Sequence, residues 1–273
     1  MGAIISVVNE KGGVGKTTTT YNLSTALALK GYRVLMVDLD YQCSLTVSCG
    51  YVPDMKEFGS TNTTDLFEKK DPSEVEDSFF TIDSIEEFCK MHPGTPDITE
   101  RLFLTPGTIS MAEMENKMFI NDKIRPQFIR NIQSLKPFFH YILVDCPPAL
   151  NLPMTAALIA SDGVLIPVKP EALDFYGLLA LDRTIKTVQE NLNPDLIVLG
   201  TILNLYRATV KSHNEYLIKL GADTERPLLG TVKETAIVTK GVEMGLPVVL
   251  NSPNSQPAKE FISIASTISE IQF

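Results

Sequence analysis

A glycine-rich run close to the start of the chain ends in a lysine and two threonines, a spacing that suits phosphate binding. Residues 10–18 read Glu-Lys-Gly-Gly-Val-Gly-Lys-Thr-Thr and lie between an apolar segment and a segment with helical spacing. Glycines let backbone N–H groups approach phosphate oxygens, and a helix N-terminus favours negative charge there. We expect Lys16 to neutralise phosphates and the Thr17 hydroxyl to bind Mg²⁺. Further phosphate contacts are expected from Lys11, Gly12, Gly13, Val14, Gly15 and Thr18.

This run departs from the usual phosphate-loop pattern, G-x-x-x-x-G-K-[ST]. Glu10 stands in the first glycine position, and a second lysine, Lys11, follows it. The ordinary interpretation of Lys11 is a solvated side chain beside the loop. The alternative is a lysine that reaches the nucleotide of a neighbouring subunit, as an arginine finger supplied in trans does.

Two further apolar segments end in carboxylates. Asp38 and Asp40 follow the segment 33–38, and Asp145 ends the segment 140–145. In open α/β sheets, ligands bind at the carboxyl ends of the strands. Each aspartate alone would suit a helix cap equally well. Together with the glycine-rich loop they predict a site for a nucleotide and Mg²⁺, in which Asp145 binds the metal through water, Asp38 supports that shell and Asp40 orients the attacking water.

Alternating strand and helix signals must position these groups. We expect an α/β fold with a mostly parallel twisted sheet, helices on both faces and the phosphate loop of an NTPase. The whole chain, 1–273, is predicted to be one domain with an acidic surface insertion at 51–100, which carries short helices near 62–69 and 84–91. The predicted strands are 3–9, 33–38, 101–105, 140–145, 162–168, 196–203 and 227–231, and the predicted helices are 16–30, 110–118, 124–136, 174–191, 209–220 and 256–271.

Charge is distributed unevenly along the chain. Residues 51–125 carry 16 acidic and 8 basic side chains, whereas the whole chain has a net charge of −9. The remainder is therefore close to neutral and can present a basic face. The four cysteines do not have the spacing of metal ligands. No apolar run approaches the roughly 20 residues of a membrane span. The predicted first strand and phosphate loop start so close to Met1 that we expect no signal peptide. These features predict a cytoplasmic protein.

Several motifs resemble those of a known family. Residues 11–19 resemble the deviant Walker A motif of the ParA/Soj/MinD ATPases, and residues 144–148 resemble their Walker B motif. Residues 37–42 are similar to the second motif, with Tyr41 where a proline is common, and 104–108 and 240–248 match weaker signatures. The resemblance implies a weak, partner-stimulated ATPase that forms an ATP-dependent homodimer. It also implies that Lys11 contacts phosphate across this dimer and takes part in catalysis with Lys16 and Asp40.

Within this family the chain is most similar to the ParA-type partition proteins. Residues 258–273 contain only one cation, Lys259, so we expect no membrane anchor of the MinD kind. Cys146 has no visible partner for an iron–sulfur cluster, and a tyrosine-rich tail is absent. Because the first apolar strand segment begins at residue 3, we expect no helix-turn-helix before it. The resemblance then implies non-specific DNA binding, association with the nucleoid and a ParB-like centromere-binding partner.

The residues that would contact DNA and adenine are less clearly marked. Arg207, Lys211, Lys219 and Lys240 are candidates for DNA phosphate contacts, although a solvated helix face would carry the same residues. Ile237 stands where some relatives have a DNA-binding arginine, which leaves open a role in positioning a protein cargo or regulating another machine. A scaffold that barely hydrolyses ATP is a third possibility, against which Lys16, Asp40 and Asp145 argue. Asn204 is expected either to bind adenine or to serve as a turn or cap residue, with Glu234 a weaker candidate for the base.

Overall fold

The computed structural model describes residues 2–54, 61–76, 78–171 and 174–273. Residues 55–60 and 77, which belong to the predicted insertion, lie outside the described residues. The strands are β1 (Ala3–Val7), β2 (Val34–Asp38), β3 (Phe80–Thr81), β4 (Leu102–Thr105), β5 (Tyr141–Asp145), β6 (Gly163–Val168), β7 (Ile197–Tyr206) and β8 (Leu228–Lys233). The helices are α1 (Lys16–Leu29), α2 (Ser44–Ser48), α3 (Asp65–Glu68), α4 (Asp83–Met91), α5 (Met111–Ile120), α6 (Ile124–Ser134), α7 (Leu152–Ala160), α8 (Asp174–Asn191), α9 (Lys211–Gly221), α10 (Ala236–Glu243), α11 (Val248–Asn251) and α12 (Gln256–Ser269), with a 3₁₀ turn at Pro72–Val75.

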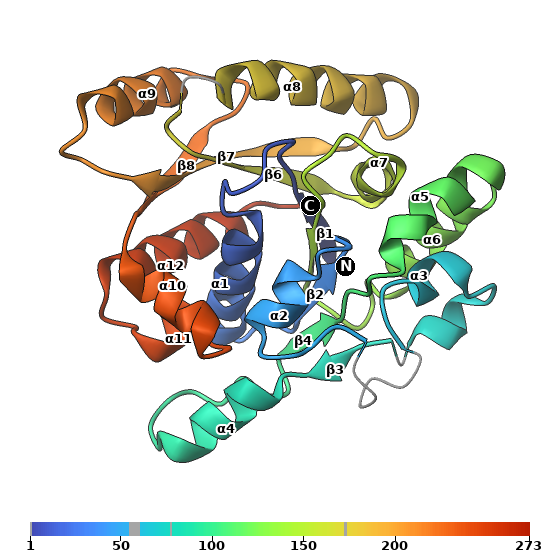
Figure 1. Ribbon diagram of the computed structural model, residues 1–273, viewed down its shortest axis with the longest axis horizontal. Coiled ribbons are helices and arrows are strands. Elements are labelled where there is room, and N and C mark those ends of the chain that lie inside the picture. Colours follow the sequence, from blue (N-terminus) through green and yellow to red (C-terminus); the bar gives the residue numbers. More distant parts are fainter. Residues whose placement is uncertain (1, 55–60, 77, 172–173) are drawn as a thin grey trace.

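The strands form one sheet in the order β3-β4-β2-β5-β1-β6-β7-β8 (Figure 1). Every neighbouring pair is parallel except β3 and β4. The predicted mostly parallel α/β sheet is therefore confirmed. Such a sheet is buried on both faces, which explains why the central strands β1, β2 and β5 are apolar at almost every position.

Two hydrophobic clusters lie on opposite faces of this sheet. One includes side chains of α3 and α5 to α9, such as Phe128 and Leu181. The other includes side chains of α1, α4, α11 and α12, such as Leu27 and Phe261. Helix α12 packs its apolar positions against α1 and β8, as expected for a C-terminal helix that belongs to the core. No helix within the described ranges is long and apolar enough to cross a bilayer.

Some elements differ from the sequence-based expectation. Helix α7 was not predicted because its segment is apolar on all sides, so it shows no helical periodicity. Strand β3 has only two residues, and α2 has five, which is too short for a pattern to be recognised. Helix α10 was also missed; it starts after Thr235, whose hydroxyl accepts a hydrogen bond from the backbone N–H of Ile237. All seven predicted strands and the six predicted long helices are present, with ends displaced by a few residues.

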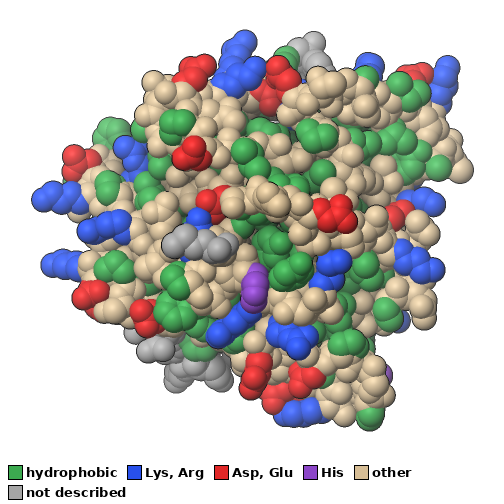
Figure 2. Space-filling view, turned by 180° about the vertical axis from the view of Figure 1, so that it is seen from behind, with side chains coloured by type: hydrophobic (Ala, Val, Ile, Leu, Met, Phe, Trp, Pro, Cys, Tyr) green, Lys and Arg blue, Asp and Glu red, His purple; other side chains and the backbone are tan. Residues whose placement is uncertain are grey.

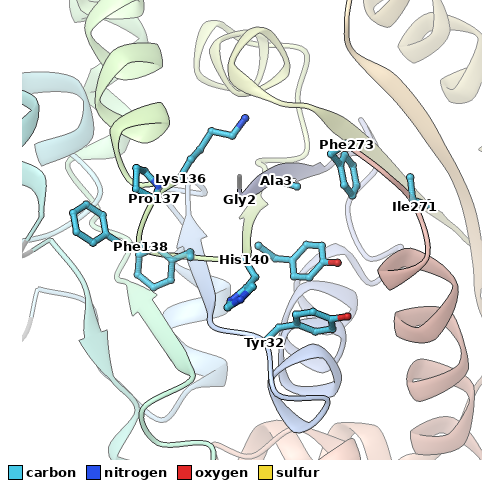
Figure 3. A pocket seen from close by; sticks show the side chains of 11 residues that line it. Gly2, Ala3, Tyr32, Lys136, Pro137, Phe138, His140, Ile271 and Phe273 are labelled. Atoms are coloured by element: carbon cyan, nitrogen blue, oxygen red, sulfur yellow. The ribbon is translucent and has the colours of Figure 1, made fainter.

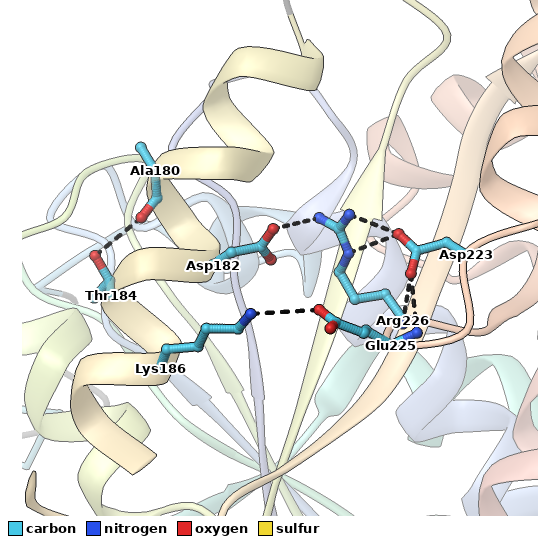
Figure 4. A network of polar contacts seen from close by, with 7 residues as sticks. All are labelled: Ala180, Asp182, Thr184, Lys186, Asp223, Glu225 and Arg226. Carbon is cyan, nitrogen blue, oxygen red and sulfur yellow. Dashed lines mark hydrogen bonds and ion pairs between the residues drawn. The ribbon is translucent and has the colours of Figure 1, made fainter. Parts of the chain in front are cut away.

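Two groups of side chains lie at different places around the sheet, one at the amino ends of the central strands and one near β8. At the amino ends of the central strands, Tyr32, His140, Phe138 and Phe273 surround a hollow (Figure 3). Near β8, the guanidinium group of Arg226 bonds to Asp182 of α8 and to Asp223, as drawn in Figure 4. This network fixes the end of α9 to α8.

Candidate functional site

The glycine-rich loop connects β1 to α1 at the carboxyl edge of the sheet. Gly13 and Gly15 have φ angles of 72° and 86°, in the left-handed region that strongly favours glycine. Helix α1 then begins at Lys16, so its free backbone N–H groups face the loop. A Cβ atom added to Gly12 or Gly13 would meet nothing within 4 Å, which leaves open space beside this part of the loop. The geometry suits a phosphate cradle.

The ammonium group of Lys16 lies inside this loop. Its Nζ donates a hydrogen bond to the carbonyl oxygen of Lys11, at 3.0 Å. Burial lowers the pKa of Lys16, while the nearby carboxylate of Asp145 acts in the opposite direction. The lysine is thus held next to the loop amides by a single carbonyl contact that a phosphate oxygen can replace.

Asp145 and Asp38 lie side by side because they are register partners at the ends of β5 and β2. The Thr17 hydroxyl donates to Asp145 Oδ2 at 2.7 Å. Burial raises the pKa of Asp145 to about 8, and the charge of Asp38 adds to this shift. The structure therefore brings together the predicted metal-site residues Thr17, Asp38 and Asp145.

Asp38 has protein partners for both carboxylate oxygens. Its Oδ2 accepts hydrogen bonds from the backbone N–H and the hydroxyl of Thr46, at 2.9 and 2.7 Å, and its Oδ1 accepts from the backbone N–H of Asp40 at 3.3 Å. Burial raises the pKa of Asp38 to about 6, although these bonds lower it. Asp38 thus also anchors α2, a function that the sequence did not indicate.

Asp40 lies just beyond β2, at the mouth of the site, and is largely buried. Its Oδ1 accepts a hydrogen bond from the backbone N–H of Gln42 at 3.0 Å. No protein donor within the described ranges bonds to its second oxygen, Oδ2. One oxygen thus fixes the side chain, and the other is available to a water molecule.

The metal-free, nucleotide-free protein is expected to lose stability as the pH rises from about 5 to about 8. Because the pKa values of Asp38 and Asp145 are raised above the ordinary value, the folded state binds more protons than the unfolded state over this interval. Thermal unfolding measured in chelator across this interval should show a falling melting temperature. Asp145→Asn should flatten the dependence, and a melting temperature that rises with pH in both proteins would contradict the prediction.

The oxygen atoms of Thr17 and the aspartates suit Mg²⁺, which needs few protein ligands, better than they suit a metal that is coordinated entirely by protein side chains. No group of three or more His, Cys, Asp or Glu side chains placed to hold a metal occurs among the described residues. Mg²⁺ commonly takes one or two protein oxygens and completes its shell with water and phosphate oxygens. The Thr17 hydroxyl would bind the metal directly and the buried carboxylate of Asp145 would bind it through water, and the charge of the metal would offset the free-energy cost of burying Asp145 and Asp38.

The side chain of Lys11 contacts the segment that follows β6. Its Nζ forms an ion pair with Glu171 Oε2, at 2.6 Å, just after β6. Glu171 also pairs with Lys169, and these two lysines lower the pKa of its carboxyl group. The side chain of Lys11 therefore lies at the rim of the site, while its backbone carbonyl accepts the hydrogen bond from Lys16 within the loop.

Two asparagines hold the loop in shape. Asn9 donates to the carbonyl oxygen of Pro167 at 2.8 Å and accepts from the backbone N–H of Lys11 at 2.9 Å. Asn204 donates to the carbonyl oxygen of Val14 at 2.9 Å and to the Thr19 hydroxyl at 3.0 Å. The role of Asn9 was not predicted, because Asn9 was assigned to the end of the strand 3–9, whereas β1 ends at Val7.

The expectation that Asn204 follows its strand as a turn or cap residue is wrong, because β7 continues to Tyr206. Its Oδ1 atom is buried and has no hydrogen-bond partner among the described residues. A buried acceptor without a hydrogen bond lowers the stability of the folded protein unless a donor reaches it. The exocyclic amino group of adenine would supply that donor.

A cavity of about 630 Å³ lies next to Asn204 and the loop. Gly15 and Thr18 line it on one side, and Thr235, Val238 and Val242 of the α10 region line it on the other. Glu234, the weaker candidate for the base, also lines it and is ion-paired with Arg207. The α10 residues were missed because nothing in the sequence relates them to a loop more than 200 positions away.

Asn204→Ala is expected to weaken nucleotide binding by about tenfold, since a buried carbonyl and a hydroxyl lose their donor. Titration with a fluorescent ADP analogue would measure this loss. Asn193→Ala is the matched control, because Asn193 also bonds to two backbone carbonyls but lies at the other end of the sheet. Equal affinities of the Asn204 variant and the control would refute the role of Asn204.

The four cations predicted to contact DNA do not form one cluster. Lys211 and Lys219 belong to α9, and Lys240 belongs to α10, on the opposite side of the sheet (Figure 1). Arg207 precedes α9 and is ion-paired with Glu234, and Lys211, whose side chain is 92% exposed, pairs loosely with Glu215 at 3.9 Å. On the face seen in Figure 2, lysine and arginine side chains stand apart among acidic and hydrophobic ones.

Comparison with known proteins agrees with this geometry. The sequence model of a family described as "AAA domain" matches residues 2–198. The sporulation initiation inhibitor protein Soj of Bacillus subtilis is 31% identical over 273 residues, covering 98% of each chain. The chromosome partitioning protein ParA of Myxococcus xanthus is 28% identical, covering 97% of this chain and 87% of its own.

A solved structure has the same fold. It is that of a cobyrinic acid a,c-diamide synthase from Mycobacterium smegmatis with bound ADP and magnesium. Its TM-score is 0.78 at 27% identity, and the match covers 98% of this chain and 94% of the other.

Proposed function

The chain belongs to the ParA/Soj/MinD family of P-loop ATPases, and from this premise we propose that it is an ATP-driven switch that partitions plasmid or chromosomal DNA. ATP and Mg²⁺ are its cofactors. The observation that carries the proposal is the pairing of a complete phosphate and carboxylate site with Lys11 at its rim. The Lys11 side chain is ion-paired with Glu171 at this rim, a position that suits a residue acting on a second copy of the chain.

Each residue of the site has a separate role in the proposed binding and hydrolysis of ATP. Mg²⁺, when bound with ATP, neutralises charge on the phosphate oxygens. Thr17 and Asp145 hold the metal side of the site, with Asp38 keeping the neighbouring loop in place. Lys16 and the loop amides hold the phosphates. Asp40 orients the attacking water through its second carboxylate oxygen.

In the proposed cycle, ATP binding joins two copies of the chain so that Lys11 of each approaches the phosphates of the other. The dimer binds DNA without sequence preference and is thereby retained on the nucleoid in the cytoplasm. Hydrolysis is slow until a ParB-like centromere-binding protein stimulates it, after which the copies separate. The 31% identity to Soj along almost the entire chain, together with the similarity to a chromosome partitioning ParA, supports this cycle.

We expect ATP-dependent binding to arbitrary duplex DNA, with an affinity that falls steeply as salt is added. Fluorescence anisotropy with a labelled duplex would measure it, with ATP and with ADP. Replacing Lys211 and Lys219 by alanine should weaken binding and lower the salt slope by about one for each lost phosphate contact. Lys90→Ala, at an exposed position on α4, is the control. The absence of ATP-dependent binding at low salt would overturn the DNA-binding part of the proposal.

A second candidate function is the positioning of a protein cargo by the same ATPase cycle. The observation that favours it is the apolar Ile237, which is 42% exposed beside Lys240, where a DNA-binding surface would carry cations. An ATP-dependent dimer that fails to bind DNA at low salt would favour this candidate over partition.

A further inference from the structure

One residue near the end of β7 has a backbone conformation that is unusual for its type. Leu205 has a φ of 54°, in the left-handed region. Bulky residues seldom adopt this region, because their Cβ atom comes too close to the following carbonyl oxygen. Backbone strain of this kind persists only where the surrounding structure imposes it, and it is concentrated at functional sites. Leu205 directly follows Asn204, the residue whose amide holds the phosphate loop.

Leu205 lies within a β-bulge. In the pairing of β7 with β8, Leu203 lies opposite Thr231, and Tyr206 lies opposite Lys233. Strand β7 therefore advances by three residues where β8 advances by two. A bulge of this kind interrupts the alternation of side chains between the two faces of a sheet and redirects the side chains beside it.

The bulge allows two nearby side chains to use opposite faces of the sheet. In a regular strand Asn204 and Tyr206 would share one face, because successive side chains alternate. Instead, the Asn204 amide donates to the Thr19 hydroxyl of α1. Tyr206 packs into the hydrophobic cluster on the other face, where its hydroxyl bonds to Asn214 of α9 (Figure 1). A regular strand would have to give up one of these two anchors.

The fit between Asn204 and the phosphate loop leaves little room for movement. A Cβ atom added to Gly15 would lie 2.7 Å from Asn204 Nδ2, so the loop approaches this amide as closely as glycine permits. The same Nδ2 atom donates to the carbonyl oxygen of Val14 at 2.9 Å. These contacts fix the amide, and its Oδ1 atom, which has no partner among the described residues, is left for a donor from the bound base. A change in the direction of β7 here would move the amide off the loop.

We propose that Leu205 is a positioning residue for the nucleotide: its left-handed backbone turns β7 so that the Asn204 amide reaches both the phosphate loop and the adenine base. This role rests on the proposed function, because it concerns the same nucleotide site. The side chain of Leu205 is 38% exposed and lines the cavity next to Asn204. Direct apolar contact with the nucleotide is therefore the competing explanation, and the two explanations rank substitutions in opposite order.

Substitutions of Leu205 separate its backbone from its side chain. Leu205→Val keeps an apolar side chain but disfavours the left-handed region, since valine is β-branched. Leu205→Gly removes the side chain and adopts that region freely. Titration with a ribose-labelled fluorescent ADP analogue should show binding about tenfold weaker in Leu205→Val and less than about threefold weaker in Leu205→Gly. Leu192→Val, at a 47% exposed position just after α8, is the matched control and should bind as the parent protein does.

A double variant tests whether Leu205 acts through Asn204. Asn204→Ala combined with Leu205→Val should bind at most about twofold more weakly than Asn204→Ala alone, because the amide to be positioned is already absent. The base gives a further readout, since guanine has a carbonyl oxygen where adenine has its amino group. Leu205→Val should therefore reduce the preference for ADP over GDP at least about threefold, whereas a merely loosened site would bind both nucleotides equally less well.

Parent-like binding by Leu205→Val, or weaker binding by Leu205→Gly than by Leu205→Val, would overturn the proposal. Additive losses in the double variant, equal losses for ADP and GDP, or parent-like binding by Asn204→Ala would do the same. If Leu205→Val fails to fold, Leu205→Ala takes its place: it keeps the Cβ atom and should bind more weakly than Leu205→Gly, and the reverse order would show a side-chain contact. These titrations use the single chain without DNA, so a failure of the DNA-partition proposal would leave their outcome unaffected.

Discussion

Replacing Lys11 with alanine is expected to lower ATP turnover by about three orders of magnitude, the effect known for a cation supplied in trans. The reason is that Lys11 would stabilise charge on the phosphates of the other copy. Nucleotide binding to the single chain should persist, because the cradle is formed by Lys16 and the loop amides. Steady-state ATPase assays and light scattering would measure turnover and dimer formation.

The control for this prediction is Glu171→Ala. It removes the same ion pair but keeps the lysine, so it separates the loss of a contact within one chain from the loss of a contact between chains. We expect Glu171→Ala to form the ATP dimer and to turn over. Unchanged dimer formation and hydrolysis in Lys11→Ala would instead show that Lys11 is only a solvated residue at the rim.

Asp40→Ala should lower turnover by about two to three orders of magnitude and should trap the ATP-bound dimer. Water would lose the carboxylate that orients it, while Lys16, Thr17 and Asp145 would keep the nucleotide bound. Size-exclusion chromatography after incubation with Mg-ATP should show a dimer that persists, and the ADP-bound variant should be monomeric.

Asp40→Asn refines this experiment. The asparagine oxygen can still accept the hydrogen bond from the Gln42 backbone N–H, so the turn after β2 is retained and only the charge is lost. Both variants should trap the dimer. Normal turnover in Asp40→Asn would remove Asp40 from the role of orienting water and would leave it a loop-stabilising residue.

The strands and the phosphate site could be predicted because their signals are local. A buried parallel strand is a short apolar run, and the glycines, lysine and threonine of the loop follow β1 within one short stretch of sequence. The aspartates at the ends of β2 and β5 lie together because the register of parallel strands places their carboxyl ends at one edge. Sequence patterns of this kind need no knowledge of distant contacts.

The features that could not be predicted depend on residues far apart in the chain. The bond from Asn204 to Val14 joins positions 190 residues apart, and the ion pair of Lys11 with Glu171 joins positions 160 apart. The anchoring of α2 by Asp38 also required the structure, because α2 is too short to show a periodic pattern. Likewise, the α10 side chains come close to the cavity next to Asn204 only when β8 is placed at the end of the sheet.

The uneven charge of the chain makes the molecule an electric dipole. Residues 51–125, with 16 acidic and 8 basic side chains, include β3, β4 and α4 at one end of the sheet, while α9 lies towards the other (Figure 1). In the field of a polyanion such a molecule turns its acidic end outward before any contact forms. A chain that approaches DNA would thus present α9 first and leave α4 facing the solvent. This orientation fades as salt shortens the Debye length, about 10 Å at 0.1 M ionic strength.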